Sequence, residues 1–302
     1  MRKALLVVLG AGLVLYGVAQ HVVNKKAAAE LEQQLTAVEE KSGISVSYNS
    51  LDASLFTDKV SLQGVAVTDA KQRQIVSAER VSLEGYQKHK VSELTEVSLI
   101  GVHLSDFYKK QFPDLPPLLQ SSRVDFSFSL SFERSTSKSA IKVSLGARDV
   151  MAANLSVQLQ NMTPLMEASQ RLMQQPSDSS PAQLSALQNS ALEALQRAQL
   201  DTVQFSVQNK GQLQQLFTEL LLGSALDRGD FYQMLETQLH NAQMAQRTKK
   251  ALLAFARGLQ RLDVSLQLPQ GTSMGELSEQ VQSFEGEPEA FADHINLQIT
   301  GQ

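Results

Sequence analysis

The sequence has no cysteine and no tryptophan among its 302 residues, and aromatic residues make up only 6% of it. The absence of cysteine excludes disulfide bonds, thiolate metal sites and cysteine nucleophiles. A small secreted animal domain would be expected to carry disulfides, whereas an exported bacterial protein can fold without them. The net charge is -4, so no basic field points to a nucleic-acid partner.

The sequence has one long apolar run, Ala4–Val23, preceded by Arg2 and Lys3. A helix needs about 20 mostly apolar residues to cross the bilayer core, and basic residues before it favour a cytoplasmic N-terminus. Residues 1–26 are therefore predicted to be a signal-anchor in a bacterial inner membrane, crossing once and leaving the body in the periplasm. Its apolar residues include Leu5, Leu6, Val7, Val8, Leu9, Leu13, Val14, Leu15 and Tyr16.

A cleaved signal peptide is the alternative interpretation of this run. Small residues at Gly17 and Ala19 fit the positions before a cut at Gln20. The apolar run continues past that site and a helical pattern follows it, which favours a retained anchor. The sequence leaves the question of cleavage open.

The residues after the anchor divide into regions with different hydrophobic periods. Residues 27–43 have a helical pattern and are predicted to form a stalk between the membrane and the body. Residues 44–161 alternate apolar and polar side chains, which indicates strands with one buried face. The clearest strand is Val124–Phe132, and the alternation slips at Gly64 and Gly101, as a β-bulge would cause.

Residues 162–302 mix helical patterns with three alternating strands. The polar faces of these strands resemble those of the earlier ones, so we expect them to continue the same sheet. The predicted fold is α+β: a curved, mostly antiparallel sheet with helices packed on its apolar face and concentrated in the C-terminal half.

Three segments, Val46–Leu55, Val60–Val67 and Ala78–Leu83, together resemble the N-terminal repeat of AsmA-like proteins. The shared pattern is a strand, a small loop, a strand with Leu-x-Gly-Val, a polar loop and a strand, after an N-terminal anchor. The family belongs to the bridge-like lipid-transfer superfamily, so the resemblance implies an apolar groove that carries acyl chains. This chain is short for a bridge, and its second half is helical.

The alternating strand at 124–132 places Phe126, Phe128, Leu130 and Phe132 on one face. The ordinary interpretation is that this ladder is core beneath the helices. The alternative is that it lines a groove for lipid, in which each buried methylene could contribute about 0.8 kcal/mol. The sequence does not decide between these alternatives.

No catalytic or metal-binding motif is recognisable. The five histidines have no metal-ligand spacing, and His103 is expected on the wet face of a strand. Glu285, Glu287 and Glu289 surround Gly286 and Pro288 in a loop that enters a helix, where acidic residues suit the helix dipole. We therefore expect a protein that is not an enzyme and needs no cofactor or metal.

These observations predict a function in envelope lipid handling or homeostasis, with membrane lipid as the partner, bound through its apolar chains. The alternative is a scaffold or assembly factor that binds another envelope protein. That alternative depends on an exposed apolar patch on the helices predicted within residues 213–259.

Overall fold

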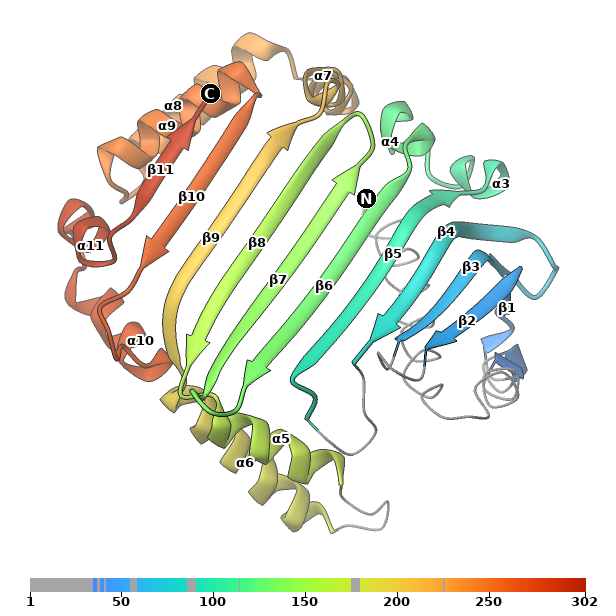
Figure 1. Ribbon diagram of the computed structural model, residues 1–302. Coiled ribbons are helices and arrows are strands. Elements are labelled where there is room, and N and C mark those ends of the chain that lie inside the picture. Colours follow the sequence, from blue (N-terminus) through green and yellow to red (C-terminus); the bar gives the residue numbers. More distant parts are fainter. Residues whose placement is uncertain are drawn as a thin grey trace.

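The computed structural model describes residues 35–36, 39–40, 42–54, 59–85, 91–113, 115–174, 180–224 and 226–302. The fold is α+β and is built on one bowed, antiparallel sheet of 11 strands (Figure 1). The strands are β1 Ser45–Ser47, β2 Ser50–Ser54, β3 Lys59–Thr68, β4 Gln74–Glu84, β5 Leu94–Leu104, β6 Val124–Glu133, β7 Lys138–Ala147, β8 Met151–Gln160, β9 Gln199–Asn209, β10 Arg261–Gln267 and β11 Gln298–Gly301.

The order of the strands in the sheet follows the order of the chain. It runs β1-β3-β4-β5-β6-β7-β8-β9-β10-β11, and β2 pairs with β3 beside β1. Strands β9 to β11 of the second half therefore extend the sheet of the first half. Because successive side chains of a strand point to opposite faces, the alternating sequence gives the sheet one apolar and one polar face.

The helices lie at the ends and along one edge of the sheet (Figure 1). They are α3 Asp106–Lys109, α4 Pro117–Ser121, α5 Thr163–Met173, α6 Pro181–Arg197, α7 Leu213–Gly223, α8 Arg228–Asn241, α9 Gln246–Gly258, α10 Met274–Ser283 and α11 Pro288–His294. The hairpin α5–α6 connects β8 to β9 at one end of the strands, and α7, α8 and α9 connect β9 to β10 at the other.

The expectation that helices cover the apolar face is correct only near the strand ends. In Figure 1 no described helix crosses the middle of β6, β7, β8 and β9. The reason is topological: each helical connection joins two strands that are neighbours in the sheet. Such a connection can turn back at the strand ends without crossing the face.

The predicted anchor, residues 1–26, lies outside the described residues. Among the described residues, no helix is long and apolar enough to cross a membrane. Within the predicted stalk, residues 27–43, Leu35 is described and is buried in the core formed with Val46, Leu62 and Val81. At this residue the segment packs against the body of the protein.

The slips in alternation at Gly64 and Gly101 have different outcomes. A bulge at Gly101 is confirmed, because the register between β5 and β6 shifts between Leu99 and Val102. The prediction of a bulge at Gly64 is wrong, because β3 pairs with β4 in the same register before and after Gly64. Both glycines have positive φ, +60° and +66°, which favours glycine over residues with a Cβ.

Candidate functional site

The middle of the sheet carries a continuous set of apolar side chains on one face, which we call the open apolar face. Alternate residues of each strand supply it, and register brings them side by side: Phe128 pairs with Val143, and Val143 pairs with Leu155. Its members are Phe126, Phe128, Leu130, Ile141, Val143, Leu145, Leu155, Val157, Val203, Phe205, Val264 and Leu266.

The side chains of the open apolar face are half-buried or exposed. Leu145 keeps 46% of its surface accessible and Phe205 keeps 37%. On β3 and β4 the apolar residues are instead fully buried, as Val65 and Leu83 at 1% exposure illustrate. The apolar side of the sheet is therefore covered over its first strands and accessible from β6 to β10.

Apolar clusters close this face at both ends of the strands. At one end α4 and α7 contribute to a cluster that also contacts Val207 and Met151. At the other end α5 packs with Phe132, Leu130 and Leu159. The buried members are Leu118, Ala147, Val150, Leu213, Leu216 and Leu259 in the first cluster, and Phe132, Met162, Met166 and Ala198 in the second.

The dimensions of the open apolar face follow from strand geometry. From Phe126 to Leu130 it extends roughly 14 Å along a strand, and from β6 to β10 it extends roughly 19 Å across the strands. Since helices close it along the strand direction, an elongated ligand fits best when its long axis runs across the strands. The row Phe128, Val143, Leu155, Phe205 and Val264 would lie beneath such a ligand.

The four residues of the predicted phenylalanine ladder do not all have the same environment in the structure. Phe132 is 3% exposed and belongs to the core beneath α5. Phe126, Phe128 and Leu130 are half-buried and belong to the open apolar face. The neighbouring apolar residues on β7, β8 and β9 belong to the same face, and their alternation in the sequence is the signal that identifies them.

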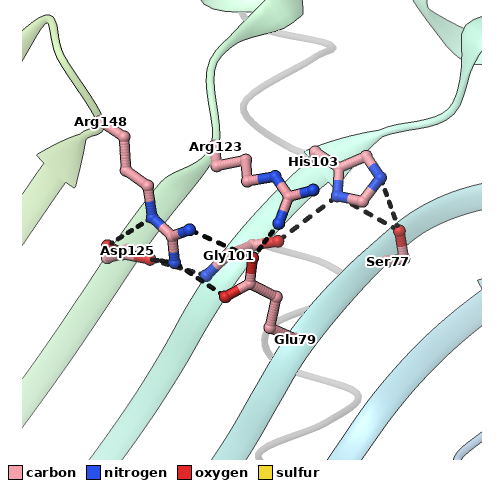
Figure 2. A network of polar contacts seen from close by, with 7 residues as sticks. All are labelled: Ser77, Glu79, Gly101, His103, Arg123, Asp125 and Arg148. Atoms are coloured by element: carbon pink, nitrogen blue, oxygen red, sulfur yellow. Dashed lines mark hydrogen bonds and ion pairs between the residues drawn. The ribbon is translucent and has the colours of Figure 1, made fainter.

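A network of charged side chains lies where the covered part of the sheet meets the open part (Figure 2). Glu79 on β4 accepts hydrogen bonds from Arg123 and from Arg148, the latter at 2.9 and 3.1 Å. Arg148 also donates to Asp125 on β6, and Asp125 accepts the backbone N–H of Gly101 at 2.6 Å.

The network links four segments of the sheet at the bulge. It joins β4, β5, the start of β6 and the turn between β7 and β8 through side chains as many as 69 positions apart in the sequence. A Cβ at Gly101 would approach the Glu79 carboxyl carbon to 2.4 Å, so glycine allows this close contact. We interpret the network as a structural clamp that fixes the bend next to the open apolar face.

Replacing the Glu79 carboxylate should show that the clamp contributes to folding stability in a pH-dependent way. Hydrogen bonds from Arg148, and secondarily Arg123, hold the pKa of Glu79 below its usual range. A lowered folded-state pKa gives stability that is present above the usual glutamate pKa and lost as the pH falls through the lowered value. Thermal melts of Glu79→Gln should therefore show a lower melting temperature than wild type at pH 7, and little difference at pH values below the lowered pKa.

The effect should be small, because the Glu79 side chain is 40% exposed and surface ion pairs are screened by water. Glu96→Gln is the matched control, since Glu96 makes no ion pair within the described part of the chain. It should give the same small difference at every pH. A Glu79→Gln deficit that persists unchanged in acid would contradict the proposed role of the carboxylate.

The histidine and glutamate residues considered from the sequence do not form a common site in the structure. His103 is half-buried on β5, and one ring nitrogen lies 3.1 Å from Ser77 Oγ on β4, as an ordinary cross-strand pair (Figure 2). Glu289 accepts the backbone N–H of Gln246, while Glu285 and Glu287 are exposed. Among the residues described, no group of His, Asp and Glu has an arrangement that could hold a metal ion.

The comparisons with known proteins assign no family. No protein-family model matches the chain, and no curated protein matches it.

Proposed function

We propose that this protein is anchored in the bacterial inner membrane through residues 1–26 and binds membrane lipid in the periplasm. Acyl chains would lie on the open apolar face, across the strands, without chemical reaction. The protein would then act in envelope lipid handling or homeostasis, as the resemblance to AsmA-like proteins implies.

One observation carries the proposal: apolar side chains from β6 to β10 form a contiguous surface that is half-buried or exposed in the described structure. Contiguous exposed apolar surfaces on a folded protein commonly mark binding sites. A chain of methylenes gains about 0.8 kcal/mol for each group that it buries. Non-directional burial of this kind needs no polar motif.

The proposal is tested by native mass spectrometry of the detergent-extracted full-length chain, followed by lipid extraction. We expect a defined lipid to remain bound at about one molecule per chain. A lipid-free mass of the folded protein, with no lipid in the extract, would contradict the proposal. The mass would also decide whether residues 1–19 are retained.

The scaffold alternative has less support. The large apolar side chains that are exposed in the described part of residues 213–259 are Leu222, at 75%, and Met234, at 42%. They lie on different helices, α7 and α8. Within the apolar stripe predicted there, Leu213, Leu216, Leu221 and Leu239 are buried inside the protein.

A further inference from the structure

The polar face of the sheet, opposite the open apolar face, contains a hollow of about 570 Å³ that spans β7 to β11. We call it the polar hollow. Polar and charged side chains make up most of its lining, among them Ser144, Asn154, Ser156, Gln204, Ser206 and Gln298. Leu155, Phe205, Val264 and Ile299 also contribute to the lining. Cross-strand register places the polar side chains in two adjacent rows. One row contains Ser144, Asn154 and Ser206, and the other contains Ser156 and Gln204.

Most of the hydrogen-bonding capacity in the polar hollow is unused. Asn154 donates to Ser206 across a long 3.5 Å contact. Within the part of the chain that the structure describes, the side chains of Ser156, Gln204 and Gln298 make no hydrogen bond. Each amide can donate and accept, and each hydroxyl can do the same, so the hollow presents mixed donors and acceptors on a concave surface.

The charged side chains in the polar hollow indicate which classes of ligand it can bind. Arg261 is paired with Asp263 on the same strand, at 2.5 Å, which leaves Lys142 as the cation without an ion pair among the described lining residues. One free positive charge is too little for nucleic acid or another polyanion. A peptide strand is also disfavoured, because the backbones of β7, β8, β9 and β10 are already paired on both sides.

We propose that the polar hollow binds a neutral oligosaccharide whose chain runs across the strands. A sugar chain presents hydroxyls that donate and accept at regular intervals, which matches rows of serine, asparagine and glutamine. The hollow crosses β7 to β11, a distance of roughly 19 Å, so several sugar units would contact it at once. This site is on the opposite face from the lipid surface and does not depend on lipid binding.

Isothermal titration calorimetry of the full-length chain in detergent, with chitotetraose as the probe, tests the proposal. We expect saturable binding by the wild-type protein. Gln204→Ala and Asn154→Ala should each weaken binding about tenfold, the effect of losing the hydrogen bonds of one amide. The control is Gln158→Ala, because Gln158 is an exposed glutamine on the same strand and face as Asn154 but outside the hollow.

The variants distinguish binding in the polar hollow from binding elsewhere on the protein. Weakened binding in Gln204→Ala and Asn154→Ala, with wild-type affinity in Gln158→Ala, supports the site. An absence of binding by wild type, or equal affinity in all of the variants, would overturn it. Lipid occupancy in the same samples should be unchanged, so failure here leaves the lipid proposal intact.

Discussion

If the wild-type chain retains lipid as proposed, a Phe128→Asp variant is expected to lose it. Phe128 lies in the middle row of the open apolar face, between Val97 on β5 and Val143 on β7. A carboxylate at this position would have to be desolvated by a bound acyl chain, at a cost of about 3 kcal/mol or more. Lipid retention should then fall on the order of 100-fold in native mass spectra.

The matched control is Ser129→Asp, which adds the same charge at the next residue of β6. Ser129 points to the opposite, polar face, where it pairs with Lys142. Its variant should retain lipid at the wild-type level, and this control also accounts for lipid held by the predicted anchor. Equal occupancy in the two variants would show that the open apolar face is not where the lipid binds. Thermal melts should confirm that both variants are folded.

A Gly301→Ala variant is expected to destabilise the edge of the sheet strongly. An added Cβ would lie 1.9 Å from the Ala251 carbonyl oxygen, in the backbone of α9. Because a helix backbone cannot rotate out of the way like a flexible side chain, α9 would have to move off β11. We expect a loss of about 3 kcal/mol in the free energy of unfolding, measured by denaturant titration.

Gly223→Ala is the control for this substitution. A Cβ at Gly223, the last residue of α7, would meet no atom within 4 Å. Replacing glycine by alanine in a helix usually gains about 0.5–1 kcal/mol, so this variant should be as stable as wild type or slightly more stable. A neutral Gly301→Ala would show that α9 does not pack tightly on β11.

The sequence by itself determined which side chains share a face of each strand. Alternation has a period of two residues in any strand, so the predicted strand Val124–Phe132 placed Phe126, Phe128, Leu130 and Phe132 on one face before any neighbour was known. The α+β class and the antiparallel sheet follow from the same local periodicity. A slip in alternation also predicted the bulge at Gly101, but a similar slip at Gly64 is not accompanied by a change of register with β4, so the slip alone did not determine where the bulge lies.

The charged network could not be read from the sequence. Arg123 lies 44 positions after Glu79 in the sequence, and Arg148 lies 69 positions after it. Nothing in their local patterns distinguishes them from other charged residues on a solvated face. The polar hollow is similar, because five strands contribute to it and each supplies only a few polar residues of kinds that are common on solvated strand faces.

Only the tertiary structure decided how much of the apolar face is covered. The sequence predicted helices of suitable amphipathic character, and the ordinary expectation was that they would bury Phe126 and Phe128. The topology instead places α5 and α7 at opposite ends of the strands, so Phe132 is buried while Phe128 remains half-exposed. Periodicity identifies the face that avoids water, but burial depends on contacts between segments distant in sequence.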